Sequence, residues 1–379
     1  MKIKISGSDL TEVLNQVSMA SGGTAGDLAN YILFRPVENI VGEKVLEVLA
    51  HSSHTFASAT VTGKAEISGS SDPFLVEGAR LLQFLTATGS GSVTLWGDEK
   101  GVKVQSENAR KPVNYPSQSA ARWPFLDEQM STIKETARVK AGEFSGALEH
   151  VKQFIFQDTK EMSVNLLESR DGYLVSTNRV VAAMACLPDL KDANIRILRA
   201  DVNAVTTWLG RNADDTEITI LEGEQFMVLR RPDGSILGVN RPLVGFPAKF
   251  LTPQIAAVGN ITLPKAATLK SLKILISAAN KQESDRVVTI KGSGTVLTLE
   301  MDGASGEVND QEIVLEHPVP DDFPTFSVLD GQFQKVLECQ HSGNNVTLGY
   351  LLRGQGGMTL FRETIGSLEL ITAQAWYVQ

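Results

Sequence analysis

Residues 2–18, KIKISGSDLTEVLNQVS, join a short alternating strand to an amphipathic helix across a polar turn. Ile3 and Ile5 alternate with lysines, as in a strand that buries one face. The apolar positions from Leu10 to Val17 then follow the spacing i, i+3, i+4 and i+7. This spacing predicts a helix with one buried stripe and a polar opposite face.

The same strand–helix pattern returns in residues 138–154 and 260–277, where Leu269, Leu272 and Ile276 mark the expected stripe of the third helix. A second pattern, a helix followed by a turn rich in Gly or Asn and then by strands, also occurs three times. Its copies are ARLLQFLTATGSGSVTLW from Ala79, VNAVTTWLGRNADDTEITIL from Val202 and GQFQKVLECQHSGNNVTLGY from Gly331. Both patterns recur about every 126 residues, which indicates an internal repeat.

The repeat predicts an α+β fold of three similar domains, each with two helices packed on antiparallel sheets. Polar and proline-containing stretches near residues 127–136 and 251–259 are suited to linkers. We therefore expect domains at residues 1–130, 131–256 and 257–379.

The composition is that of a folded protein. The chain has 379 residues, of which 42% are hydrophobic and 21% charged, and its net charge is −9. Disordered chains combine low hydrophobicity with high net charge. The longest apolar run, residues 180–187, is much shorter than the roughly 18–20 residues of a membrane helix. No signal peptide is evident at the start, so we expect a cytoplasmic protein that does not associate with membranes.

No motif in the sequence predicts catalysis. Gly89-Ser90-Gly91 and Gly292-Ser293-Gly294 suit hairpin turns and are not placed to cradle a phosphate. Two cysteines, Cys186 and Cys339, exclude a disulfide scaffold, although a Cys/His nucleophile stays open. His51 and His54 lack a nearby carboxylate or cysteine and are interpreted as solvated side chains. We expect no enzyme, no metal and no cofactor.

Several segments carry a resemblance to one family. They are residues 1–23, the helix around 76–85, residues 154–167 with Gln157-Asp158, VSTNRV at 175–180 and GFP at 245–247. These segments resemble parts of the bacterial sliding clamp, the beta subunit of DNA polymerase III, and the resemblance covers the whole chain. It implies a ring formed by a head-to-tail homodimer around duplex DNA.

The resemblance also implies partners. They are double-stranded DNA bound without sequence specificity, the catalytic subunit of a DNA polymerase, and a clamp loader. Sliding favours weak phosphate contacts over hydrogen bonds to bases, so polar and basic side chains on the helices are expected to face the DNA. These expected residues are Arg80, Lys152, Gln153, Gln157, Arg211, Lys270, Lys273 and Lys335.

Clamp partners insert a short peptide with apolar and Gln side chains into a groove between the second and third domains. By resemblance the groove residues are Thr177, Arg179, Val180, Pro247, Trp376, Tyr377, Val378 and Gln379. The turn Thr177-Asn178-Arg179 lacks the Gly-His pair of the clamp segment, and the C-terminal tail differs from the usual one. These departures suggest another peptide preference and a clamp encoded by a phage or mobile element. An alternative is a clamp-fold interaction protein or decoy that binds clamp partners without encircling DNA.

Overall fold

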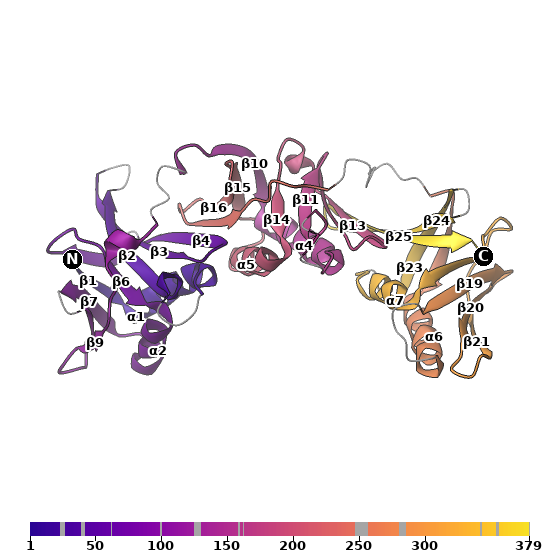
Figure 1. The fold of residues 1–379 in the computed structure, drawn as a ribbon, viewed down its shortest axis with the longest axis horizontal. Helices are drawn as coiled ribbons and strands as arrows, with labels where there is room; N and C mark the ends of the chain where they lie inside the picture. The colour runs from indigo at the N-terminus through magenta and orange to yellow at the C-terminus, as the bar shows by residue number, and fades with distance from the viewer. Residues whose placement is uncertain are drawn as a thin grey trace. The chain divides into compact units, whose positions relative to one another are not determined.

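Figure 1 shows the fold of the chain in a computed structural model. The residues that the structure describes are 1–22, 27–38, 42–61, 63–98, 101–124, 130–157, 160–161, 163–246, 257–279, 286–341, 343–353 and 356–378. Within these residues, no helix is both long and apolar enough to span a membrane.

The chain divides into two compact units. The first comprises Met1–Ser145 with Asp192–Leu243, and the second comprises Gly146–Lys191 with Val244–Gln379. The middle third of the sequence therefore contributes to both units. The predicted division into three domains at residues 130 and 256 stays a prediction.

Antiparallel sheets and helices build the first unit. One sheet has the order β5-β1-β7-β8-β9 and the other β10-β15-β16-β17-β4-β3-β2-β6. The strands are β1 (Lys2–Ser6), β2 (Tyr31–Glu38), β3 (Lys44–His51), β4 (Thr55–Val61), β5 (Ala65–Ser68), β6 (Phe74–Glu77), β7 (Ser92–Asp98), β8 (Gly101–Ser106), β9 (Val113–Tyr115), β10 (Lys134–Lys140), β14 (Arg196–Leu198), β15 (Glu217–Glu222), β16 (Phe226–Arg230) and β17 (Ile236–Asn240). The helices are α1 (Gly7–Val17), α2 (Gly78–Thr88) and α5 (Arg199–Leu209).

The second unit is also built from antiparallel strands and helices. Its main sheet follows the order β11-β12-β13-β25-β22-β19-β20-β21, and β24, β23 and β18 continue from β25. The strands are β11 (Leu166–Arg170), β12 (Tyr173–Thr177), β13 (Val181–Cys186), β18 (Gly259–Pro264), β19 (Val287–Ser293), β20 (Val296–Asp302), β21 (Val308–Val314), β22 (Phe326–Leu329), β23 (Asn345–Arg353), β24 (Gly356–Ile365) and β25 (Leu368–Val378). The helices are α6 (Lys265–Ala278) and α7 (Asp330–Glu338), while the boundary between the units falls within α4 (Ala141–Val151).

The predicted strand–helix segments are confirmed. Each appears as a strand followed directly by a helix: β1 with α1, β10 with α4, and β18 with α6. At the first, the Ser6 hydroxyl caps α1 by accepting the Asp9 backbone N–H at 3.0 Å and donates to the Asp9 carboxylate at 2.6 Å. The α+β class with antiparallel sheets is therefore confirmed, and the polar residues 6–9 form the N-cap and first turn of α1.

The buried stripe of α6 differs from the expected one. Leu272 is buried as predicted, but its companions are Thr268, Ser271 and Leu275 in place of Leu269 and Ile276. Thr268 is accommodated because its hydroxyl donates to the Pro264 carbonyl at 2.9 Å. The helix has apolar residues on more than one side, so the period alone did not identify the face that packs.

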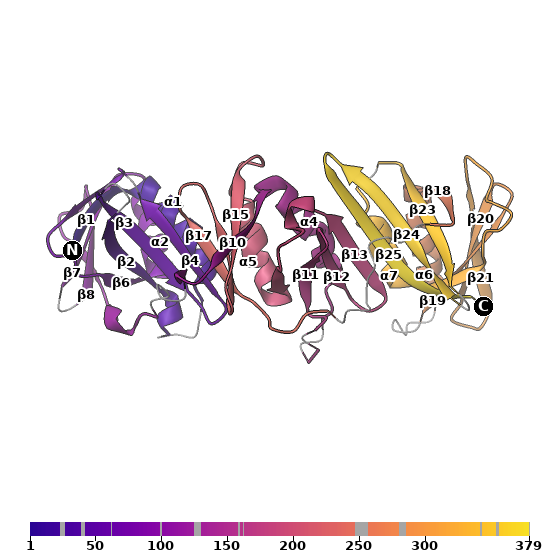
Figure 2. The same ribbon diagram turned by 90° about the horizontal axis from the view of Figure 1, so that it is seen from above.

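Strand pairing joins distant parts of the chain within each unit. In the first unit β17 pairs with β4, with Ile236 opposite Ser58 and Gly238 opposite Phe56. A Cβ at position 238 would overlap the Phe56 ring, so this contact requires glycine. In the second unit β13 pairs with β25, with Val181 opposite Gln374 (Figure 2).

An acidic side chain is buried near the start of α5. Asp201 is 4% exposed, and its Oδ2 atom has no hydrogen-bond partner among the described residues. Burial raises the pKa of this carboxyl to about 6, because the ionised form is poorly solvated, while the nearby His54 acts in the opposite direction. The ionised carboxylate therefore destabilises the fold.

We expect Asp201→Asn to stabilise the protein at neutral pH. The folded state retains the Asp201 proton up to about pH 6, whereas the unfolded state loses it near pH 4. Wild-type stability should therefore fall as pH rises through this window, and the variant should lose that dependence and gain about 3 kcal/mol above it. Denaturant unfolding between pH 4 and 8 measures this. Equal pH profiles for Asp201→Asn and Asp215→Asn, which alters an exposed carboxylate of the same unit, would contradict the assignment.

Candidate functional site

Four lysines expected to face DNA lie in the second unit. Lys270 and Lys273 are exposed on one side of α6, next to Leu269 and Ile274. Lys335 lies on α7, and Lys152 lies in the short helical turn that follows α4. Helices α6 and α7 contact each other (Figure 1).

Lys335 is held in place by two contacts. Its ammonium donates to the Gln153 carbonyl and lies 5.3 Å from the centre of the Phe154 ring. Lys335 and Gln153 both line a cleft of about 640 Å³ between α4 and α7. The structure thus brings these two predicted residues together. Gln157, also predicted to face DNA, is exposed beyond the helical turn that contains Gln153.

Glutamates moderate the charge of these lysines. Lys273 lies 3.7 Å from Glu338, and Lys152 forms an ion pair with Glu149. Lys270 has no ion pair among the described residues. Exposed pairs of this kind contribute only about 0–1 kcal/mol each, so the lysines remain able to attract phosphates. The result is a mildly basic set of helix side chains in an acidic protein.

Two predicted residues lie in the first unit. Arg80 is exposed on α2 and forms an ion pair with Glu77 at 2.8 Å. Arg211 is exposed directly after α5. The role of all eight residues in DNA binding stays a prediction.

The predicted groove residues Thr177, Arg179 and Val180 form the turn between β12 and β13. Thr177 is buried, and its hydroxyl donates to the Val181 carbonyl at 2.9 Å and accepts the Arg179 N–H at 3.0 Å. Asn178 fixes the turn further, because its side-chain oxygen accepts the backbone N–H groups of Val180 and Val181 at 3.1 and 2.8 Å. These hydrogen bonds make a short, rigid turn.

Arg179 is the exposed side chain of this turn. Its φ of 78° lies in the left-handed region, which an arginine adopts only at the expense of backbone strain. The guanidinium stacks on the half-buried Phe156 at 4.7 Å from the ring centre and forms an ion pair with Glu161. Arg179, Phe156 and Glu161 therefore form one surface cluster beside the turn.

The turn lies beside the C-terminal strand. The Ala375 N–H donates to the Val180 carbonyl at 3.0 Å, which continues the pairing of β13 with β25. Trp376 is only 2% exposed and stacks on Phe326 with ring centres 4.9 Å apart. Tyr377 and Val378 continue β25, whereas Pro247 and Gln379 lie outside the described residues.

The residue before Pro247 is anchored to β11. The Phe246 N–H donates to Glu168 at 2.8 Å, and its carbonyl accepts from Arg170 at 3.1 Å. Glu168 and Arg170 also pair with each other at 2.9 Å. The chain leading to Pro247 is thus held against the sheet that contains β12 and β13.

Sequence reasoning did not identify Asn178, Phe156 or Glu161 as parts of this site. Asn178 carried a usable signal, because asparagine commonly binds backbone N–H groups in tight turns. It also donates to Gln332 of α7 at 2.7 Å. For Phe156 and Glu161 the sequence held no such signal, because only the folded turn brings these side chains to Arg179.

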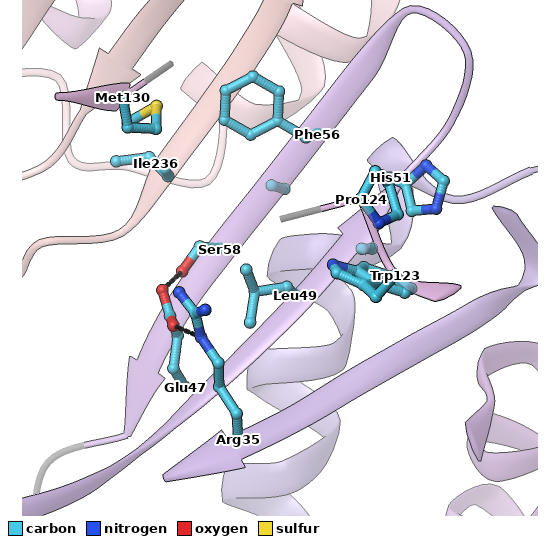
Figure 3. A pocket seen from close by; sticks show the side chains of 12 residues that line it. Arg35, Glu47, Leu49, His51, Phe56, Ser58, Trp123, Pro124, Met130 and Ile236 are labelled. Carbon is cyan, nitrogen blue, oxygen red and sulfur yellow. Dashed lines mark hydrogen bonds and ion pairs between the residues drawn. The ribbon is translucent and has the colours of Figure 1, made fainter. Parts of the chain in front are cut away.

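A separate cavity lies in the first unit (Figure 3). It encloses about 170 Å³, below the roughly 300–1,000 Å³ of typical ligand pockets. Its Glu47 carboxylate already accepts from Arg35 at 2.5 Å and from Ser58 at 2.7 Å. His51 is half-buried with its ring edge-on to Trp123, 4.5 Å between centres, so its interpretation as a solvated side chain is wrong. The cavity therefore offers little to a reaction.

The sequence matches no protein-family model, and no curated protein matches it. Solved structures do match. The DNA polymerase III subunit beta from Pseudomonas aeruginosa is 14% identical with a TM-score of 0.81, and the match covers 100% of both chains. The sliding clamp from Caulobacter crescentus is 14% identical with a TM-score of 0.79 over 98% of each chain. The beta subunit from Thermotoga maritima is 15% identical with a TM-score of 0.77, over 99% of this chain and 98% of that one.

At these identities the comparisons establish the fold. The resemblance seen in the sequence is thereby confirmed at the level of architecture, over the full chain and with bacterial proteins of one kind. The chain has the fold of the DNA polymerase III beta sliding clamps.

Proposed function

We propose that this chain is a DNA sliding clamp, a non-catalytic cytoplasmic processivity factor that encircles duplex DNA and tethers a replicative polymerase. The observation that carries the proposal is the match over 100% of both chains at a TM-score of 0.81.

The proposed DNA contacts are weak and independent of sequence. Lys152, Lys270, Lys273 and Lys335 supply point charges for phosphates, and their glutamate neighbours limit the attraction. A protein that slides needs a shallow energy profile along the duplex, which base-specific hydrogen bonds would interrupt.

Two sheet edges support closure of a head-to-tail dimer. Strand β9 ends the first unit's smaller sheet and follows the exposed Arg110 and Lys111. Strand β21 ends the main sheet of the second unit and carries the exposed Asp310 and Glu312. Open edges present unpaired backbone groups, and opposite charges favour pairing of β9 with β21 of a second copy.

We expect light scattering to give twice the 41.0 kDa chain mass across a concentration series. Arg110→Glu with Lys111→Glu should shift the protein toward monomer, because like charges would then face each other. Adding Asp310→Lys and Glu312→Lys to the same chain should restore the dimer.

A monomer at every concentration would contradict encirclement and favour the alternative, a clamp-fold protein that binds clamp partners without enclosing DNA. A dimer unaffected by the charge reversals would locate the interface elsewhere.

The α6 lysines should contribute to DNA binding. We expect Lys270→Glu with Lys273→Glu to weaken binding to a labelled duplex and to reduce the slope of log K against log[salt] by about 2, since each lost phosphate contact accounts for about 0.9. Fluorescence anisotropy over a salt series measures both. Lys191→Glu changes an exposed lysine outside the helices and is the matched control. Equal slopes for the double variant and this control would exclude α6 from the DNA-facing surface.

For the partner groove we propose the turn at residues 177–180, the cluster of Arg179 with Phe156 and Glu161, and the adjoining end of β25. The bound segment is a short peptide with apolar and Gln side chains. Trp376 supports this surface from the core, since its side chain is buried. The shortened turn would give the groove its own peptide preference and suits a clamp that serves a phage or mobile-element polymerase.

Two substitutions at Arg179 separate binding from strain. Arg179→Gly should raise the free energy of unfolding by about 1 kcal/mol, because glycine adopts the left-handed region freely. Arg179→Ala keeps the strain and should not stabilise. Both variants should weaken binding of the peptide equally. Fluorescence polarisation measures the binding, and denaturant unfolding measures the stability. Unchanged affinity in both variants would remove Arg179 from the groove.

A further inference from the structure

Two histidines and a glutamate converge in the cleft between α4 and α7. His150 lies on α4, His341 follows α7, and Glu363 lies on β24. One ring nitrogen from each histidine and one carboxylate oxygen of Glu363 all lie within 4.8 Å of one another. His150 and His341 line the cleft of about 640 Å³. The three residues are far apart in sequence and come together only in the fold.

His150 is held as metal-binding histidines usually are. It is 2% exposed, and its Nε2 atom lies 3.3 Å from both the Ile371 carbonyl oxygen and the Thr372 hydroxyl oxygen. The carbonyl can only accept a hydrogen bond, and the hydroxyl can accept one as well. A neutral imidazole carries one N–H, and donating it to this carbonyl leaves Nδ1 with a free lone pair. Nδ1 is buried and has no hydrogen-bond partner among the described residues. A backbone carbonyl that fixes one ring nitrogen in this way is the common outer partner of a metal-ligating histidine.

Glu363 is fixed beside the histidines. Its two carboxylate oxygens accept the backbone N–H of His341 at 2.9 and 2.8 Å. The carboxylate is thereby held beside the two imidazole rings. Zinc–ligand bonds of about 2.0–2.2 Å would require the ligand atoms to approach by about 1 Å. The exposed His341 side chain has the freedom to supply that movement.

We propose that His150, His341 and Glu363 form a binding site for a divalent transition-metal ion, with Zn²⁺ as the best fit. Two imidazoles with one carboxylate suit zinc and disfavour Mg²⁺ and Ca²⁺, which prefer all-oxygen ligands. Three protein ligands leave a coordination position open toward the cleft. The ion would link α4, β24 and the end of α7, and would thereby stabilise the second unit.

Zinc binding to the full-length protein tests the proposal. Competition with a chromophoric chelator should give one Zn²⁺ per chain, and Zn²⁺ but not Mg²⁺ should raise the melting temperature. His341→Ala and Glu363→Gln should each weaken Zn²⁺ binding at least about tenfold, since even loss of an outer partner costs 10- to 100-fold. His317→Ala removes an exposed histidine beyond β21 and should bind like the wild type. Equal affinity in all four proteins would show adventitious binding and overturn the site.

Cobalt substitution identifies the ligands. Co²⁺ in the wild-type protein should give the visible spectrum of a nitrogen–oxygen site, and His341→Ala should change it. Cys339 lines the same cleft, so a thiolate-to-cobalt charge-transfer band that disappears in Cys339→Ser would overturn the proposed ligand set. Because these measurements need neither DNA nor a partner, their failure would leave the clamp proposal unaffected.

Discussion

The hydrogen-bonding requirement of sheet edges governs this fold. A strand at an edge leaves backbone groups unpaired, and here edges from distant parts of the chain satisfy one another. β4 pairs with β17 in the first unit, and β13 pairs with β25 in the second. The second pairing places the turn at residues 177–180 next to the C-terminal strand. The surface proposed for partners thus depends on the backbone pairing of β13 with β25. Its side chains can change while that pairing persists.

The distribution of charge differs between the proposed DNA-facing helices and the sheet edges proposed for the dimer interface. The chain carries a net charge of −9, yet the exposed side of α6 presents Lys270 and Lys273. Acids are instead frequent on the edge strand β21, opposite in sign to the residues before β9. Net charge alone would have argued against a DNA-binding protein, but the local field at a helix surface depends on where charges lie. An acidic body with mildly basic helices is compatible with weak, mobile contact with phosphates.

Periodicity in the sequence was sufficient to predict the strand–helix segments, because burying one face imposes a regular pattern on each element. It was insufficient for α6, where apolar residues on several sides concealed the packed stripe. The turn at Thr177 was recognised by resemblance, but the left-handed φ of Arg179 and its contact with Phe156 arise from tertiary geometry. Trp376 could not be distinguished as a core residue, since its burial against Phe326 depends on the pairing of β22 with β25.

The internal repeat offers a measure of what the fold itself demands. The tenth residue of each strand-linked helix is Gln16 in α1, His150 in α4 and Ile274 in α6. Three unlike side chains occupy this position, so the fold does not require an imidazole there. A polar ring that is buried, with one nitrogen unpartnered, is destabilising unless something binds it. At His150 the exposed His341 and the anchored Glu363 would supply the remaining ligands of the proposed ion. The buried imidazole with an unpartnered nitrogen is therefore particular to the second repeat, where a bound ion would satisfy it.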